Sequence, residues 1–357
     1  MPAPPRSEAL LVALRLLAPG TPLRDGVERI LQARMGALIV VGAGPEVLSV
    51  CSGGFLLDAE FTPQRLSELA KMDGAIIIAA DCRRIVRANV HLVPDPNIPT
   101  AETGTRHRTA ERVGRQIDVP VITISEDRSE VAVHVRGQKR EIEPTPRVLA
   151  RADQALQILA RYKTRLDAVS SSLSALEVED LVTVRDVATV LQRSEMVRRI
   201  AEEVEGYVIE LGADGRLVML QLEELSGGVE DDRRLVTKDY FVAGPGRMLP
   251  DSLGRLSSLH DDDLLDLHQV AAVLRVPAAL GLDSAVQSRG YRILHKIPRL
   301  PEAVAEHIVE RFGSLQKVMR ASETDLVTVE GVGEIRARAV KDGLARLAET
   351  SILDRYS

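Results

Sequence analysis

The chain has 357 residues, which is too long for one typical domain, so two or three domains are expected. Its net charge of −6 and its pI of about 5.8 exclude a protein that coats nucleic acid over its whole surface. Cys51 and Cys82 form no CxxC pair, which argues against a disulfide or a zinc site, and no segment approaches the ~20 apolar residues of a membrane span. These features predict a cytoplasmic protein without a membrane segment.

Between about residue 8 and residue 145, segments typical of helices and strands alternate, which predicts one mixed sheet flanked by helices. The expected helices are 7–17, 23–34, 63–71 and 107–116, and the expected strands are 36–41, 47–51, 76–80, 85–87, 121–125 and 131–135. The glycines in 42–45 favour a hairpin turn over a nucleotide-binding loop. No third glycine completes a GxGxxG pattern there, and no helix is predicted to follow.

A carboxylate lies at the junction between the helix 63–71 and the strand 76–80. Asp73 and Gly74 stand in a tight turn, where the carboxylate can bind a divalent cation or accept a proton from a hydroxyl group. Gly74 lets a ligand approach the backbone closely, with Ala75 beside it. An ordinary Asp-Gly turn without a ligand is the alternative.

The start of the helix 107–116 has the features of a phosphate-binding site. Gly104 and Thr105 precede Arg106, His107 and Arg108 at its first turn. A helix N-terminus offers unpaired N–H groups and the positive end of the macrodipole, and arginine adds a bidentate fork of donors. The alternative is a plain helix start with solvated cations.

Residues 147–281 change in character, because apolar residues recur there at three- and four-residue spacing and predict helices. Periodicity leaves 207–220 open between helix and hairpin. The glycine- and proline-rich stretch 227–250 is expected to be a loop. The acidic run 261–263 is interpreted as a solvated helix start and not as a metal site.

The segment from residue 288 has features of DNA backbone binding. A short helix over 322–329 leads into Gly331 and Gly333 and then into a second helix, which resembles a helix-hairpin-helix element. Its glycines admit a phosphate, and Arg336, Arg338 and Lys341 supply cations. Residues 294–312 look like a degenerate first copy without the paired glycines.

Charge supports the same interpretation of this segment. Residues 288–347 carry eleven Lys and Arg against eight Asp and Glu, so this segment is +3 and the remainder of the chain is −9. Glu330 and Glu334 flank the glycines, so moderate and salt-sensitive DNA affinity is expected. A protein–protein docking module is the alternative.

Three segments resemble the diadenylate cyclase domain of the DNA-integrity scanning protein DisA family. They are Asp73-Gly74-Ala75, 87–94 and 104–108, and with the C-terminal segment the resemblance covers essentially the whole chain. It implies an α/β cyclase domain over 1–146, an all-α spine over 147–287 and a helix-hairpin-helix DNA-binding domain over 288–357. It also implies condensation of two ATP molecules into cyclic di-AMP and two pyrophosphates, with Mg²⁺ or Mn²⁺, at a face-to-face contact of two cyclase domains.

The resemblance further implies a homo-octamer, binding of branched or junction DNA, and a role for each site residue. Asp73 is expected to bind the metal or polarise the attacking 3′-hydroxyl. The phosphates are assigned to Arg106, His107 and Arg108, and His107 is interpreted as a phosphate donor in preference to a general base. The remaining expected ATP contacts are Gly74, Ala75, Leu92, Gly104, Thr105, Thr109 and, more weakly, Ser125. His91 is expected to be structural.

Two other functional classes stay open at this point. One is a DNA-junction sensor that binds ATP without turning it over. The other is a DNA-repair nucleotidyltransferase or ligase, since Lys71-Met72-Asp73-Gly74 matches the letters of a KxDG pattern, although no other ligase motif accompanies it.

Overall fold

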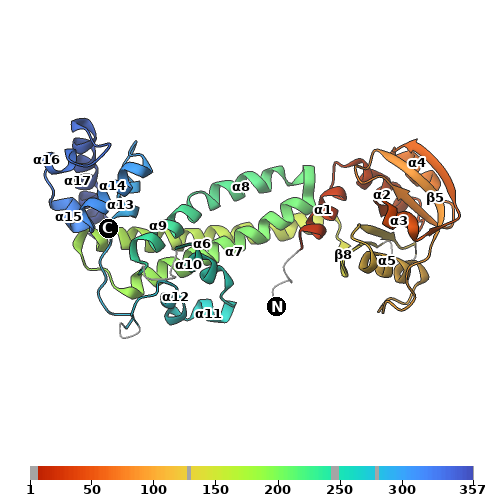
Figure 1. The fold of residues 1–357 in the computed structure, drawn as a ribbon, viewed down its shortest axis with the longest axis horizontal. Helices are drawn as coiled ribbons and strands as arrows, with labels where there is room; N and C mark the ends of the chain where they lie inside the picture. The colour runs from red at the N-terminus through yellow and green to blue at the C-terminus, as the bar shows by residue number, and fades with distance from the viewer. Residues whose placement is uncertain (1–6, 127–129, 243–248, 278–280, 357) are drawn as a thin grey trace. The chain divides into compact units, whose positions relative to one another are not determined.

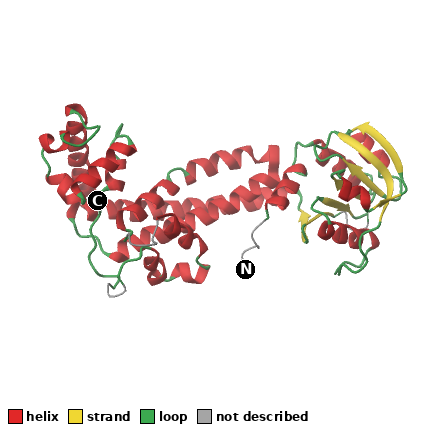
Figure 2. Ribbon diagram, viewed as in Figure 1, coloured by secondary structure: helices red, strands yellow, loops and turns green. Residues whose placement is uncertain are grey.

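The computed structural model describes residues 7–126, 130–242, 249–277 and 281–356. The chain forms two compact units. The first comprises Met1–Gln154 and Val204–Leu220, and the second comprises Ala155–Glu203 and Gln221–Ser357. Within the described residues, all strands belong to the first unit, and the second is helical (Figure 2).

A mixed sheet forms the centre of the first unit (Figure 1). Its strands are β1 (Ala37–Val41), β2 (Cys51–Ser52), β3 (Phe55–Glu60), β4 (Ala75–Ile78), β5 (Arg84–Leu92), β6 (Val121–Ile124), β7 (Val131–Val135) and β8 (Gln138–Ile142). They are ordered β2-β5-β4-β1-β6-β7-β8, and β3 also pairs with β5. β1 and β4 are parallel, whereas the other neighbouring strands are antiparallel. The expected mixed sheet is confirmed.

Helices cover both faces of this sheet because side chains alternate along its buried strands. Ile39 and Ile76 point to the face packed by α1 (Glu8–Leu16), α2 (Pro22–Gln32) and α4 (Pro63–Leu69). Their neighbours in sequence, such as Val40 and Ile77, point to the opposite face, which α3 (Pro45–Ser49) and α5 (Thr105–Gln116) cover. Two apolar cores therefore enclose the sheet, which fixes the strand ends that carry the site.

Side-chain caps start three of these helices. The oxygens of Ser7, Thr21 and Thr62 accept hydrogen bonds from the backbone three residues ahead, at α1, α2 and α4 respectively. Proline follows the cap at the start of α2 and α4, where its fixed φ suits the helix and its missing N–H costs nothing. The helices expected at 7–17, 23–34, 63–71 and 107–116 are confirmed, with ends that differ by a few residues.

The strand expected at 47–51 and the hairpin turn at 42–45 are wrong. Gly44 is instead the N-cap of α3, with Pro45 at its first position, and β1 pairs with β4 and β6. A helix of five residues is too short to show a helical period, so its apolar residues look like a strand. The sequence also missed β3, whose exposed Phe55, Leu56 and Leu57 show no alternation of polar and apolar residues, and the edge strand β8.

The chain is helical from α6 (Thr145–Glu179) onward, as expected. The helices before residue 281 are α6, α7 (Val184–Leu211), η1 (Gly212–Gly215), α8 (Arg216–Ser226), α9 (Val229–Tyr240), α10 (Leu249–Ser258), α11 (Asp261–Leu265) and α12 (Leu267–Val273). The open stretch 207–220 is therefore helical, broken by a 3₁₀ turn at the glycines. The acidic run 261–263 is the first turn of α11, as predicted.

A loop over the whole of 227–250 is wrong, because α9 occupies much of it. Gly228 starts this helix at φ +75, and Leu235 and Val236 are buried on it. Charged residues outnumber apolar ones along α9, which hid its amphipathic pattern. Residues 243–248 of the same stretch lie outside the described residues.

The C-terminal helices contain a repeat with an offset of 32 residues. They are α13 (Tyr291–His295), α14 (Glu302–Phe312), α15 (Leu315–Arg320), α16 (Glu323–Val327) and α17 (Glu334–Tyr356). The pair α13 and α14 matches the pair α16 and α17 in the length of its first helix and of its turn. Arg299, at φ +64, takes the place of Gly331, at φ +82. The first copy predicted from the sequence is thus present as a helix, turn and helix.

Both cysteines are free thiols and are half-buried. Burial raises the pKa of Cys51, and it raises that of Cys82 to about 11 with help from Asp81. Among the described residues, no helix is both long enough and apolar enough to cross a bilayer.

Candidate active site

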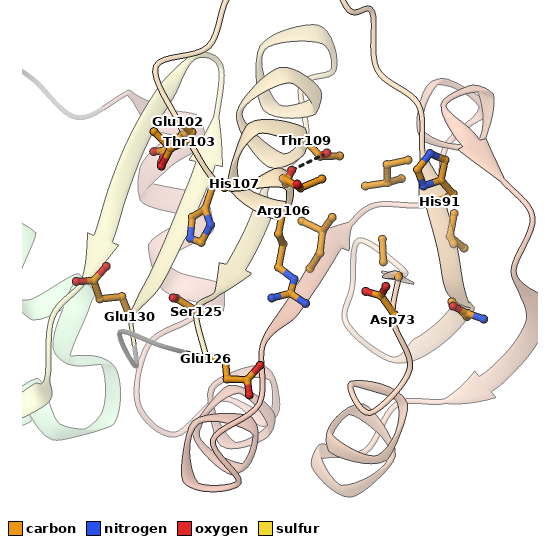
Figure 3. Close-up of a pocket in the computed structure, with 18 of the residues that line it drawn as sticks. Asp73, His91, Glu102, Thr103, Arg106, His107, Thr109, Ser125, Glu126 and Glu130 are labelled. Atoms are coloured by element: carbon orange, nitrogen blue, oxygen red, sulfur yellow. Dashed lines mark hydrogen bonds between the residues drawn. The ribbon is translucent and has the colours of Figure 1, made fainter.

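A cavity of about 830 Å³ opens at one end of the central strands in the first unit (Figure 3). The turn before β4, the end of β5, the start of α5 and the loop after β6 form its walls. Its lining comprises Leu38, Asp73, Gly74, Ala75, Asn89, Val90, His91, Leu92, Glu102, Thr103, Gly104, Thr105, Arg106, His107, Thr109, Ser125, Glu126, Glu130 and Lys139. Segments that are far apart in sequence thus meet in one hollow.

The turn between α4 and β4 carries Asp73 into the cavity. Gly74 follows at φ +142, and a Cβ atom there would lie 2.8–2.9 Å from the backbone and side chain of Asn89. Asn89 itself has φ +55 and lies where β5 bulges against β4. A bulge beside a site redirects side chains at that point. Glycine is therefore required at position 74 for its conformation and for the space that Asn89 takes.

The N-terminus of α5 forms the facing wall. Gly104 is its N-cap and has no side chain to satisfy the first N–H groups, and the first turn contains no acidic residue. The Thr109 hydroxyl donates to the Thr105 carbonyl at 2.9 Å. Arg106 extends from this turn toward the side of the cavity where Asp73 lies (Figure 3). Within the described part of the chain, its guanidinium has no hydrogen-bond or ion-pair partner.

Polar groups on α5 fix the loop that leads to this N-terminus. Glu111 accepts hydrogen bonds from the Thr100 hydroxyl at 2.5 Å and from the Ala101 N–H at 3.2 Å. The guanidinium groups of Arg112 and Arg115 donate to the carbonyls of residues 98 and 99, at 3.0 and 2.9 Å. Burial acts to raise the pKa of Glu111, but the hydrogen bond from Thr100 and the charge of Arg115 outweigh it and lower the pKa. Charged side chains of α5 thus fix the loop over residues 98–101 by hydrogen bonds.

An ion pair lies in the same cavity. The Lys139 ammonium is 2.8 Å from the Glu102 carboxylate. The hydrogen bond from Lys139 lowers the pKa of Glu102, and the same bond raises the pKa of Lys139. Among the described residues, four carboxylates line the cavity against two cationic side chains, Arg106 and Lys139.

His134 on β7 does not line the cavity; it is 2 % exposed, and its Nε2 has no partner among the described residues. Burial, followed by the charge of Lys139, lowers its pKa to about 4. The ring is therefore neutral at pH 7. His107 lies on the cavity wall itself (Figure 3).

Almost all the ATP-site residues predicted from the sequence line this one cavity. Arg108 is the exception: its side chain is exposed and does not line the cavity. Lys71, the residue of the KxDG pattern, is also outside it and pairs with Glu68 at 2.7 Å. His91, expected to be structural, is exposed on the cavity wall.

Sequence reasoning missed the lining residues Asn89, Glu102, Thr103, Glu126, Glu130 and Lys139. Asn89 gave a signal, because asparagine is the residue that best tolerates the left-handed conformation opposite a glycine. Lys139 gave none, because its strand was not expected.

The predicted DNA-contact residues divide into two groups. Gly331 and Gly333 lie in the turn before α17, and the guanidinium of Arg336, in the first turn of that helix, donates to the Gly331 carbonyl at 2.6 Å. Arg338 is 72 % exposed. Lys341 instead donates to the carbonyls of Met319 and Ala321, both at 2.8 Å, and so caps the end of α15.

The residues of the cavity could bind a divalent cation only together with the phosphates of a bound nucleotide. Within the described residues, no group of three or more His, Cys, Asp and Glu side chains could hold a metal ion. Mg²⁺ is commonly bound by one or two carboxylates together with substrate phosphates, and Asp73 facing Arg106 suits that arrangement.

Comparisons with known proteins agree with this geometry. A family model described as DisA bacterial checkpoint controller nucleotide-binding matches residues 24–139, and one described as DisA bacterial checkpoint controller linker region matches residues 142–281. The chain is 54% identical to the DNA integrity scanning protein DisA of Frankia casuarinae and 56% identical to that of Kineococcus radiotolerans, with 100% of both chains covered in each comparison. It is 54% identical to the DisA protein of Streptomyces coelicolor, over 96% of this chain and 93% of that one. The chain therefore belongs to the DisA family.

Proposed function

We propose that this protein is a diadenylate cyclase, a nucleotidyltransferase that condenses two ATP molecules into cyclic di-AMP and two pyrophosphates. The observation that carries the proposal is the convergence of Asp73 and Arg106 on one cavity at the N-terminus of α5, where the Arg106 guanidinium has no partner among the described residues. Phosphoryl transfer depends chiefly on alignment and on stabilising charge, which these groups supply.

The geometry suggests a role for each group. In this proposal the Asp73 carboxylate binds the metal or polarises the attacking 3′-hydroxyl of the ribose. Arg106 and the N–H groups after Gly104 bind phosphate oxygens, and Leu92 and Ala75 contribute apolar surface near the base and sugar. The exposed Arg108 is assigned to phosphate at the rim of the cavity, with His107 on the wall.

One cavity holds one nucleotide, whereas the product contains two. A twofold dimer with its cavities face to face places each 3′-hydroxyl near the other nucleotide's α-phosphate, so two identical half-sites complete the reaction. The face-to-face contact of two cyclase domains that the family resemblance implies has this arrangement. We therefore propose that the catalytic site forms only between two copies of the chain.

The charge of the cavity supports a requirement for Mg²⁺ or Mn²⁺. Four carboxylates against two cations give the described lining a net charge of about −2, which disfavours a triphosphate. A divalent cation held by Asp73 and by phosphate oxygens would supply the missing positive charge at the reacting centre.

We also propose that the turn before α17 acts as a helix-hairpin-helix element and binds the backbone of branched or junction DNA. No atom lies within 4 Å of a Cβ at Gly333, and Arg336 and Arg338 are exposed beside this turn. Lys341 is excluded from this role because it caps α15.

Incubating the full-length protein with ATP and Mg²⁺ or Mn²⁺ tests the cyclase proposal. Chromatography should detect cyclic di-AMP with the wild type. Asp73→Asn should reduce product formation by at least ~100-fold while ATP binding remains, since it removes the negative charge and little volume. Asp81→Asn is the matched control, because Asp81 is exposed beyond the other end of β4 and does not line the cavity.

Two results would contradict the proposal. ATP binding without product would favour the non-catalytic junction sensor. An AMP adduct on Lys71, seen by mass spectrometry, would favour the ligase alternative.

A further inference from the structure

Gly36, directly before β1, lies against the phosphate-binding arginine. A Cβ atom at Gly36 would be 2.2 Å from Nη1 of Arg106 and 3.0 Å from its Cζ. The third-nearest atom is the Ile124 carbonyl oxygen, at 3.2 Å. The guanidinium therefore occupies the space that any larger residue at position 36 would need.

The backbone itself does not require glycine at this position. Gly74 and several other glycines have φ values in the left-handed region, but Gly36 does not. An alanine could adopt the same backbone conformation without strain. What the absent side chain provides at Gly36 is space, and Arg106 fills that space.

The location of Gly36 explains how this contact serves the cavity. Ala37, the next residue, pairs with Ile124 on β6, and Ser125 and Glu126 follow at the cavity wall. Arg106 comes from α5 and reaches this end of β1 and β6, pointing into the cavity (Figure 3). Gly36 is not part of the lining, so its influence on a ligand passes through Arg106.

We propose that Gly36 is a positioning residue that seats the Arg106 guanidinium for phosphate binding, an inference that rests on the proposed cyclase function. Carbon and nitrogen atoms that are not bonded prefer a separation of roughly 3.5 Å, so a methyl group at position 36 displaces the guanidinium by about 1 Å or more. The guanidinium is the flexible end of a side chain, so it moves while the sheet stays intact. A shift of ~1 Å at a positioning group costs up to ~100-fold in rate.

A double-mutant cycle tests the proposal in the full-length protein. Gly36→Ala should lower kcat/KM for cyclic di-AMP formation by about 10- to 100-fold and weaken ATP binding, with an unchanged melting temperature. Arg106→Ala should lower kcat/KM by at least the same factor. Adding Gly36→Ala to Arg106→Ala should cause no further loss, because the displaced group is gone.

Gly44→Ala is the matched control, since no atom lies within 4 Å of a Cβ at Gly44, and it should leave activity unchanged. Wild-type activity in Gly36→Ala, or an equal loss with and without Arg106, would overturn the seating role. Unfolding of both Gly36→Ala and the double variant would also overturn the seating role, because it would show that the added methyl group clashes with the Ile124 backbone and not with Arg106. If Arg106→Ala alone kept full activity, the proposed phosphate role of Arg106 would fail instead.

Discussion

His134 shows how burial of a titratable group affects stability. It is a buried imidazole on β7, and its pKa is lowered to about 4. An unfolded histidine has a pKa near about 6.5. Between about pH 4 and pH 6.5 this histidine is therefore protonated in the unfolded chain and neutral in the folded chain. Folding stability therefore falls as the pH decreases from about 6.5 to about 4.

We expect His134→Phe to remove this dependence. Relative to the variant, the wild type should lose about 3 kcal/mol of unfolding free energy between pH 7 and pH 4, because the lowered pKa spans roughly 2.5 units. Urea unfolding at several pH values measures the difference. Between pH 7 and pH 8 the two proteins should keep a constant difference, and parallel profiles down to pH 4 would contradict the interpretation.

At the scale of elements, the two helix pairs of the C-terminal region share one backbone plan but differ at one turn position. Gly331 occupies the left-handed position in the second pair, and Arg299 does so in the first. A Cβ at Gly331 would lie 3.2 Å from Val304 on α14, so glycine also allows close packing there. The second turn therefore combines a compact backbone with the exposed cations Arg336 and Arg338.

Salt dependence tests whether this turn binds DNA phosphates. Arg336→Ala should weaken binding to a four-way junction and reduce the slope of log K against log salt by about 1, as expected for one lost phosphate contact. Arg320→Ala is the control, because it removes an equal charge from the exposed face of α15. An equal loss in both variants would indicate a general charge effect, and no loss in either would favour the protein-docking alternative.

At the scale of the whole molecule, the C-terminal helices are part of the second compact unit. Arg292 on α13 is fully buried and pairs with the equally buried Glu177 of α6. Asp239 of α9 accepts hydrogen bonds from the backbone N–H groups of residues 290, 291 and 292. Burial, with the charge of Glu177, raises the pKa of Asp239 to about 7. The boundary proposed at 287/288 thus passes through a buried polar network.

Deleting residues 288–357 should consequently destabilise the rest of the helical unit. The deletion leaves Glu177 without its counterion, a change that costs about 3–5 kcal/mol when the group stays buried. Circular dichroism should show a lower melting temperature for the shortened chain, whereas Arg336→Ala should melt like the wild type. A deletion variant with the melting temperature of the intact protein would show that the C-terminal segment is an independent domain.

The sequence by itself determined the local features of the site. The Asp73-Gly74 turn and the basic first turn of α5 depend on neighbouring residues, so their spacing predicts them. The central strands are also predictable, because buried β-branched runs differ strongly from their surroundings. The short helix α3 and the exposed strand β3 were not, because neither has a period or a contrast in polarity.

Only the tertiary structure decided which of these residues act together. Asp73, Arg106 and Lys139 meet because β4, α5 and β8 belong to one sheet and its covering layer, and sheet pairing joins residues far apart in the chain. The same packing places Lys341 on the end of α15 and Arg106 against Gly36. These contacts join residues that are distant in sequence, so they arise from the packing of the elements and cannot be predicted from local sequence patterns.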